Sequence, residues 1–342
     1  MFKGIDFYSD TVTKPTPGMR KAISEAEVGD EQKGEDPTTR RLEERVAEML
    51  GHTGAMFFPS ATMANELALR LLCERGDEVI AAEMAHVFGA EVGGPAVIAN
   101  VMCRPIYNDT GVFSGQDIRN LYRFSTGPHY PRTRLVVVEN TSNMAGGIAW
   151  QRAELNDVLS TAKELGLKTH LDGARLMNAA AATGLKPNEI AAPFDTATLC
   201  LSKGLGCPTG AVLVFDKAHV ESVRRLKQMM GGAMRQSGIL AAAGLYALDH
   251  HVERLSEDHK NAGRLAEGLA TIPGITVEKK FNPTNMVFFH WNGKISSDEW
   301  HTRVQKQNIR FSFAGKDRLR AVLHLDISKE DVEKTIKILK DI

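Results

Sequence analysis

Apolar runs and amphipathic stretches alternate along the first two thirds of the chain. The helical period occurs at 38–50, which ends at Gly51, in the segment that follows Ser60, and at 153–165. Short, mostly apolar runs predict buried strands at 55–59, 78–82, 135–140, 168–172, 196–202 and 210–215. Strands that are apolar on both sides and are separated by helices predict an α/β fold with a mostly parallel sheet.

The pattern changes beyond Gly238. A long helical stretch covers about 239–269, and three apolar segments, IPGITVEKK, NMVFFHW and RAVLHLDIS, precede a helix at 329–339. This order predicts a smaller α+β domain at the C-terminal end, joined to the large domain without a flexible linker. We expect an N-terminal arm, a large domain and a small domain, at 1–15, 16–245 and 246–342.

The composition and the charge disfavour several classes of protein. The 342 residues are 43% hydrophobic and 25% charged, which is typical of a folded protein with a large core. Lys+Arg and Asp+Glu number 42 each, and this balance disfavours a nucleic-acid or anionic-membrane partner. The first residues include Lys3, Asp6 and Asp10, and no apolar run reaches about 18 residues, so we expect neither secretion nor membrane insertion.

The cysteines give a further indication about the environment of the protein. The four cysteines form no CxxC pair and have no zinc-like spacing with histidine. We therefore expect reduced thiols, a cytoplasmic location and no metal site.

Two charged residues follow predicted strands at the edge where open α/β sheets bind their ligands. Asp172 ends the strand at 168–172, and Lys203 follows the strand at 196–202. A pyridoxal 5'-phosphate (PLP) site needs such a pair, because the amine forms a Schiff base with the aldehyde and the carboxylate keeps the pyridine nitrogen protonated. The alternative is a solvated charge, which is the more common role of a lysine at a strand end.

Nine blocks of the sequence, in order, resemble the threonine aldolases, also called the aromatic amino acid β-eliminating lyase/threonine aldolase group. These are aspartate-aminotransferase-like, fold type I PLP enzymes, and the resemblance covers nearly the whole chain. The blocks are FYSDTVTKPTPGM (7–19), VGDEQKGEDPT (28–38), FFPSATMAN (57–65), RGDEVIAAEMAH (75–86), VVVENTSN (136–143), HLDGARLMNAA (170–180), CLSKGLGCPTGAVL (200–213), MMGGAMRQSGILAAAGLYAL (229–248) and RAVLHLDIS (320–328). The fold that the resemblance implies agrees with the fold that the hydrophobic pattern predicts.

The resemblance implies roles for the residues around the ring of the cofactor. Lys203 would be the Schiff-base lysine, Ser202 beside it would also bind the cofactor, and Asp172 would be the partner of the pyridine nitrogen. His86 matches the histidine that lies over the ring, and it is the candidate acceptor of the β-hydroxyl proton. A buried histidine that only stacks on the ring is the alternative role.

The resemblance also implies where the carboxylate and the phosphate would bind. Arg175 would hold the substrate carboxylate or the region of the ring oxygen, and Ser9 and Arg320 would complete the carboxylate pocket. Ala61 and Thr62 open a helix after a strand, so their N–H groups and the Thr62 hydroxyl could bind the phosphate. A further phosphate ligand, Arg235, would reach across a subunit interface, which implies a dimer within a tetramer.

Three positions depart from the usual pattern of the family. Alanine stands at 61 where glycine is usual, and it keeps the N–H but restricts the turn. Lys33 stands where a tyrosine is expected, and Ser142 stands where a second histidine is expected. We interpret Lys33 as favouring a substrate with an acidic or polar β-substituent, or as replacing contacts between subunits. Serine is no general base at neutral pH, so proton transfer would fall to His86, a water or another group.

The activity that the resemblance implies is that of a low-specificity L-threonine/allo-threonine aldolase. This carbon–carbon lyase cleaves an L-β-hydroxy-α-amino acid into glycine and an aldehyde. A related PLP-dependent lyase or racemase that acts on another amino acid, such as 3-hydroxyaspartate or phenylserine, is an alternative, because these enzymes share the electron sink. A non-catalytic binding paralogue is the third possibility, but it would be expected to lose Lys203 or Asp172, and both are present.

Overall fold

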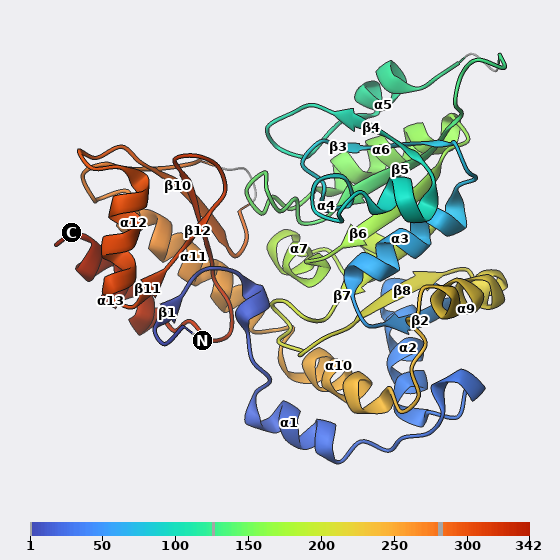
Figure 1. The fold of residues 1–342 in the computed structure, drawn as a ribbon, viewed down its shortest axis with the longest axis horizontal. Helices are drawn as coiled ribbons and strands as arrows, with labels where there is room; N and C mark the ends of the chain where they lie inside the picture. The colour runs from blue at the N-terminus through green and yellow to red at the C-terminus, as the bar shows by residue number, and fades with distance from the viewer. Residues whose placement is uncertain (1, 125–126, 280–282) are drawn as a thin grey trace.

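A seven-stranded sheet forms the centre of the larger part of the molecule (Figure 1). The computed structural model describes residues 2–124, 127–279 and 283–342. The strand order is β2 (Gly54–Phe58), β8 (Ala211–Phe215), β7 (Thr196–Cys200), β6 (Lys168–Gly173), β5 (Thr133–Glu139), β3 (Glu78–Ala82) and β4 (Met102–Ile106). All pairs from β7 to β4 are parallel, and β8 is antiparallel to both of its neighbours. The predicted mostly parallel sheet is confirmed.

Helices surround this sheet, and several of them begin at a capping side chain. They are α1 (Pro17–Ser24), α2 (Pro37–Leu50), α3 (Ala61–Leu72), α4 (His86–Gly89), α5 (Gly115–Leu121), α6 (Arg152–Glu164), α7 (Leu176–Thr183), α8 (Pro187–Ala191), α9 (Val220–Met229) and α10 (Gly238–His250). At the start of α2 the Asp36 side chain accepts a hydrogen bond from the Thr39 N–H, and Gly51 ends the helix at φ 77°. The helices predicted at 38–50, after Ser60 and at 153–165 are confirmed as α2, α3 and α6.

The helical stretch predicted at about 239–269 consists of two helices, α10 and α11 (Leu255–Leu269). Alanines of α10 belong to the hydrophobic core of the large sheet, whereas Leu265 and Leu269 of α11 belong to a separate core. At the break, His251 is buried and its Nδ1 lies 2.7 Å from the carbonyl oxygen of Leu205. Leu255, the first residue of α11, still belongs to the core of the large sheet, so the chain passes from one core to the other along α11.

The second core belongs to a four-stranded antiparallel sheet that is flanked by helices, at the left of Figure 1. Its strands, in order, are β12 (Ser312–Phe313), β13 (Arg318–Val322), β10 (Met286–Trp291) and β9 (Ile275–Val277). The helices α12 (Ser297–Lys306) and α13 (Lys329–Leu339) complete this part together with α11, and the helix predicted at 329–339 is confirmed.

The N-terminal segment joins this C-terminal part rather than extending freely. The strand β1 (Ile5–Asp6) pairs in parallel with β11 (Ile309–Arg310). The buried Phe7 stacks on Phe311 with ring centroids 5.4 Å apart. Within the described ranges, none of the helices combines the length and the apolar character that crossing a membrane requires.

Candidate active site

Asp172 lies at the carboxyl end of β6, next to the central sheet's buried core. Its carboxylate accepts hydrogen bonds from Asn65 Nδ2 at 2.9 Å and from the Ala174 N–H at 3.0 Å. The Asn65 Oδ1 in turn lies 3.2 Å from Nε2 of His170, a buried residue whose pKa burial lowers to about 4. His170 is therefore neutral, and these bonds fix both the Asn65 amide and the Asp172 carboxylate in place.

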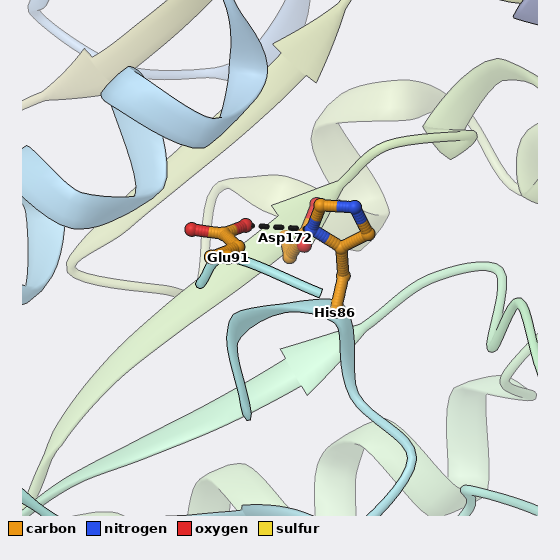
Figure 2. A group of neighbouring side chains, drawn as sticks. All are labelled: His86, Glu91 and Asp172. Atoms are coloured by element: carbon orange, nitrogen blue, oxygen red, sulfur yellow. Dashed lines mark hydrogen bonds and ion pairs between the residues drawn. The ribbon is translucent and has the colours of Figure 1, made fainter. Parts of the chain in front are cut away.

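His86 is the first residue of α4, and its ring lies close to Asp172. Its Nδ1 is 2.7 Å from Oε1 of the buried Glu91, and one ring nitrogen or carboxylate oxygen from each of His86, Glu91 and Asp172 lies within 4.8 Å of the other two. Figure 2 shows the His86 and Glu91 side chains pointing toward one another beside Asp172 at the end of β6. The hydrogen bond to Glu91 raises the pKa of His86, although burial opposes this.

Lys203 lies on the loop that joins β7 to β8. Its carbonyl oxygen accepts hydrogen bonds from Thr13 Oγ1 at 3.1 Å and from the Gly206 N–H at 2.8 Å, and these bonds fix the backbone of the loop. Its positive charge acts to lower the pKa of Asp10, Glu139 and His86, so Lys203 lies within electrostatic range of these three side chains. The predicted lysine therefore shares a site with the predicted histidine.

Glu139 is the buried residue around which the charged groups of this site meet. It ends β5, beside Asp172 in the parallel register. Burial and the Asp172 charge raise the pKa of Glu139 to about 7, while the charges of His86 and Lys203 oppose this rise. Lys203, Asp172 and His86 thus converge at the carboxyl edge of the sheet, as the sequence predicts for the first two.

The arrangement fits PLP. Ser60 Oγ caps α3 by accepting a hydrogen bond from the Met63 N–H, so the N–H groups of Ala61 and Thr62 remain at the positive end of the helix. The same helix carries Asn65, which holds Asp172, so one element links the predicted phosphate end to the predicted ring-nitrogen partner. Ser202 lies beside Lys203, with its Oγ 3.6 Å from the Sγ of Cys200.

A cluster of charged and polar groups adjoins Lys203 at the boundary between the two cores. Arg175 donates from Nε and Nη2 to the carboxylate of the buried Asp10, at 2.7 Å each. Burial would raise the pKa of Asp10, but Arg175 outweighs it and the pKa falls to about 2. Ser9 caps the short helix η1 (Asp10–Val12) by accepting from the Thr11 N–H. Asp10 therefore occupies two donors of Arg175, and Nη1 remains for another acceptor.

Arg320 reaches the same cluster from β13. Its Nη1 donates to Asn143 Oδ1 at 3.0 Å, and Arg175 Nη1 lies 3.5 Å from the same oxygen. Its other hydrogen bonds go to neutral oxygens, the Ser312 Oγ and the Tyr8 carbonyl. Burial and the nearby charge of Arg175 lower the pKa of Arg320. The guanidinium groups of Arg175 and Arg320 thus lie beside one amide oxygen, an arrangement that could hold a carboxylate.

The structure places Lys33 and Arg235 in a separate group. Lys33 is exposed at the end of η2 (Glu31–Lys33), and the Arg235 side chain is 61% exposed. The Arg235 Nη1 donates to Asp30 at 3.0 Å, and its carbonyl accepts from the Glu31 N–H at 2.8 Å. Within the described part of a single chain, the hydrogen bonds of Arg235 do not connect it to the Lys203 site.

Ser142 is buried after β5, but the next residue is the one that contacts the arginines. A Cβ on Gly111 would lie 1.9 Å from Ser142 Oγ, so this hydroxyl packs directly against the glycine. The following Asn143 bonds to Arg320 and, through its backbone N–H, to Glu139 Oε2 at 3.2 Å. Asn143 is thus a site residue that the sequence did not indicate by itself.

Sequence reasoning missed several other residues of this site. Glu139 stands at a predicted strand end, as Asp172 does, and this position was a usable signal. Asp10, Asn65 and Glu91 gave no comparable signal, because their partners come from elements that are distant along the chain or from an irregular loop.

Known proteins resemble this chain over nearly its whole length. The family model described as Beta-eliminating lyase matches residues 6–292. Low-specificity L-threonine aldolase 1 of Arabidopsis thaliana is 37% identical to the chain, over 98% of this chain and 95% of the relative. Among solved structures, the threonine aldolase of Leishmania major has a TM-score of 0.85 at 20% identity and covers 98% of this chain and 99% of its own.

A serine palmitoyltransferase variant from S. paucimobilis, solved with bound PLP, has a TM-score of 0.78 at 18% identity and covers 99% of this chain and 87% of its own. At such identities these two structures support the fold, which is that of the fold type I enzymes, whereas the family rests on the matched model and on the close relative. The chain belongs to the beta-eliminating lyase family.

Proposed function

We propose that this protein is a low-specificity threonine aldolase that uses PLP to cleave L-threonine and L-allo-threonine into glycine and acetaldehyde. The observation that carries the proposal is the meeting of Lys203, Asp172 and His86 around Glu139 at the carboxyl edge of the sheet. The 37% identity to a plant enzyme of that name, over 98% of the chain, supports it.

We assign a separate role to each group of side chains in the site. Bound PLP supplies an aldehyde for the lysine and a ring that accepts electrons. Asp172, held by Asn65 and Ala174, is placed to keep the ring nitrogen protonated. The N-terminus of α3 at Ala61 and Thr62 is suited to the phosphate, since a helix N-terminus favours anions.

The remaining groups would bind the amino acid and accept its proton. Arg320 and the Nη1 of Arg175 are suited to the substrate carboxylate, with Asn143 between them and Ser9 nearby. His86 uses Nδ1 in its bond to Glu91, which leaves Nε2 to take the β-hydroxyl proton. Ser142 is no general base at neutral pH, so we assign this duty to His86.

The proposal is tested with purified protein and added PLP. We expect the visible absorption of a lysine-bound cofactor and the release of acetaldehyde and glycine from both threonine diastereomers. Lys203→Ala should lose the borohydride-reducible attachment of the cofactor and the aldehyde release. A keto acid with ammonia, or a D-amino acid, in place of these products would instead indicate an eliminating lyase or a racemase.

Lys33 supports a narrower proposal about substrate preference. It is an exposed cation where the family usually has an aromatic residue, and a cation favours a substrate with an acidic or polar β-substituent. Lys33→Tyr should therefore lower the ratio of catalytic efficiency on 3-hydroxyaspartate to that on threonine. An unchanged ratio would reject the preference and leave a role in subunit contacts.

We also propose a homo-oligomer, a dimer with shared sites within a tetramer. Arg235 supports this, because it is exposed and its hydrogen bonds go to Asp30 and Glu31 rather than to its own chain's Lys203 site. The test mixes and reassembles the inactive variants Lys203→Ala and Arg235→Leu. If one site takes Lys203 and Arg235 from different chains, one site of each mixed dimer is intact and about a quarter of the activity returns. No recovery from dimers shown to have exchanged would reject shared sites.

Two further proposals concern the chain as a whole. A cytoplasmic location is supported by its four free cysteines, three of them buried, since unpaired thiols are typical of reducing compartments. A division into an arm, a large domain and a small domain at 1–15, 16–245 and 246–342 is supported by the separate hydrophobic cores, between which α10 and α11 form the passage.

A further inference from the structure

A pair of buried glutamates lies behind His86, on the side away from its free ring nitrogen. Glu66, on α3, is 1% exposed, and Glu91 is 4% exposed. Glu91 acts on Glu66 through its charge and through a side-chain hydrogen bond, and both effects raise the pKa of Glu66. In the described part of the protein, no N–H or hydroxyl group reaches Glu66 Oε1, Glu66 Oε2 or Glu91 Oε2. The two carboxyl groups therefore have only each other on that side.

Such a contact requires a proton. Two ionised carboxylates cannot share a buried hydrogen bond, because neither has a hydrogen to donate and their charges repel. The backbone closes the site, since a Cβ on Gly94 would lie 2.1 Å from Glu66 Oε1. Burial and the Glu91 charge raise the pKa of Glu66 to about 9. From β4, the Cys103 thiol is affected by the Glu66 charge, which raises the pKa of the thiol.

The other contacts indicate which of the two glutamates holds this proton. Glu91 Oε1 accepts from Asn65 Nδ2 at 3.1 Å and lies 2.7 Å from His86 Nδ1. Glu91 Oε1 therefore has two partners, Asn65 and His86, whereas no donor in the described part of the chain reaches either oxygen of Glu66. We propose that Glu66 stays protonated and donates to Glu91, and thereby acts as a positioning residue that keeps Glu91 an ionised acceptor for the His86 Nδ1–H.

This chain of hydrogen bonds determines how His86 can act. With Nδ1 donating to Glu91, the lone pair of the neutral ring is on Nε2, the atom left for the substrate proton. A proton on Glu66 stabilises the Glu91 charge and so limits how strongly Glu91 draws a second proton onto His86. The use of Nε2 rests on the proposed aldolase function, whereas the location of the proton on Glu66 does not.

The groups that face His86 define what a titration would detect. They are Glu91 from the loop after α4, Asp172 from β6 and Lys203 from the loop after β7. Asn65 bonds to both Glu91 and Asp172, so the glutamate pair and the predicted ring-nitrogen partner share one amide. We therefore expect the Glu66–Glu91 pair to affect the pKa of His86 both in the cofactor-free protein and in the protein with cofactor.

The first experiment measures the pKa of the His86 ring by NMR in the cofactor-free protein. Glu66→Leu removes the donor to Glu91, and we expect the His86 pKa to rise by about half a unit or more, since loss of a donor makes a carboxylate more basic. Glu66→Gln restores a donor through its amide and should return the value to that of the wild type. Glu43→Gln, which changes another glutamate with a raised pKa away from His86, is the matched control and should leave it unchanged.

The second experiment detects the proton directly by infrared spectroscopy. At pH 8, above the pKa values of about 7 of Glu43 and Glu139, the difference between wild type and Glu66→Gln should show the carbonyl stretch of a protonated carboxylic acid. A missing band, or a His86 pKa that is the same in Glu66→Leu and the wild type, would overturn the proposal. Because neither readout uses turnover, a protein that passes both but releases no acetaldehyde would contradict the aldolase function alone.

Discussion

Asp10 and Arg320 are charged residues of the site that differ in their partners, since Asp10 pairs with an opposite charge and Arg320, among the residues that the structure describes, does not. The Asp10 carboxylate meets both donors of the Arg175 fork at 2.7 Å, so its charge is matched. Arg320 bonds to neutral oxygens of Asn143, Ser312 and Tyr8. A guanidinium group without a carboxylate partner is costly to bury, so an incoming carboxylate would gain more at Arg320 than at Arg175.

This difference predicts the effect of Arg320→Leu. We expect KM for L-threonine to rise by about 10- to 100-fold, because a charge-assisted hydrogen bond contributes about 1.5–3 kcal/mol. Steady-state acetaldehyde release measures it. Arg303→Leu on the exposed face of α12, where Arg303 pairs with Glu299, is the control and should keep the KM of the wild type. A KM for Arg320→Leu equal to that of the control would show that the substrate carboxylate binds elsewhere.

The sequence predicted those site residues whose position next to a predicted strand already indicates a role in ligand binding. Lys203 and Asp172 follow predicted strands, and parallel strands end at one edge of a sheet. It did not reach Glu91, because that residue lies in an irregular loop whose path decides where the carboxylate points. It also missed Asp10, whose partner Arg175 is 165 positions away along the chain.

The end of β6 brings its neighbour β7 unusually close. Gly173 pairs with Leu199, and a Cβ at Gly173 would lie 2.1 Å from the backbone oxygen of Thr198. A backbone atom cannot move aside as the end of a flexible side chain can. The glycine therefore permits the spacing that places Asp172 beside the loop of Lys203.

Gly173→Ala should consequently destabilise the protein by at least about 2 kcal/mol and weaken the binding of PLP. Urea unfolding and titration with PLP measure the two effects. Gly263→Ala in α11 is the control, because nothing lies within 4 Å of an added Cβ there and alanine favours a helix. It should be neutral or stabilising. Equal stability of the two variants would refute the tight approach of β6 and β7.

A half-buried carboxyl group links α2 to β2. Glu43 Oε1 accepts from the Phe57 N–H at 2.8 Å, and burial raises the pKa of Glu43 to about 7 although this bond opposes it. The folded protein thus binds this proton more tightly than the unfolded chain does. Its stabilising contribution is complete below the unfolded pKa near 4.5 and is lost as the pH rises through about 7.

Glu43→Gln has no carboxyl group at this position, so its stability does not fall in this way as the pH rises. Relative to the wild type, the variant should gain stability on the order of 1–2 kcal/mol between pH 5 and pH 8. Denaturant unfolding at the two pH values measures the change, and Glu44→Gln on the exposed face of the same helix is the control. If the free energy of unfolding of each variant differs from that of the wild type by the same amount at both pH values, the carboxyl of Glu43 does not titrate in this range.

Predictions of helices and strands from the sequence succeeded where the pattern is local. The strand at 78–82 and the helix at 329–339 have the predicted bounds, because continuous apolar runs and caps mark them. The break between α10 and α11 was missed, since both helices have helical periodicity and the break depends on two separate cores. The two-residue β1 was missed because its partner, β11, is at the other end of the chain.

The whole molecule is held together partly by its N-terminal segment. Phe7 is fully buried in the C-terminal core, where it stacks on Phe311. A few residues later, Asp10 binds Arg175 and Thr13 binds the carbonyl of Lys203. The segment therefore connects the smaller part of the molecule to the site at the central sheet.

Phe7→Ala should destabilise the protein by about 3–5 kcal/mol, because it removes a buried aromatic ring. We expect a lower Tm, and also a higher KM for threonine, because the same segment carries Asp10 and contacts Arg320. Calorimetry and kinetics measure the two effects, and Tyr8→Phe, at a 45% exposed neighbour, is the control. A variant with lower Tm but normal KM would show that the segment supports the core without affecting the site.

The pairing of β1 with β11 has a consequence for biosynthesis. Asp6 and Arg310, which these strands bring together, are 304 positions apart, so β1 is synthesised long before its partner strand. A ribosome-bound chain can form the parallel strands in order, but β1 cannot pair until β11 has emerged. We therefore expect the nascent protein to stay inactive until β11 has emerged.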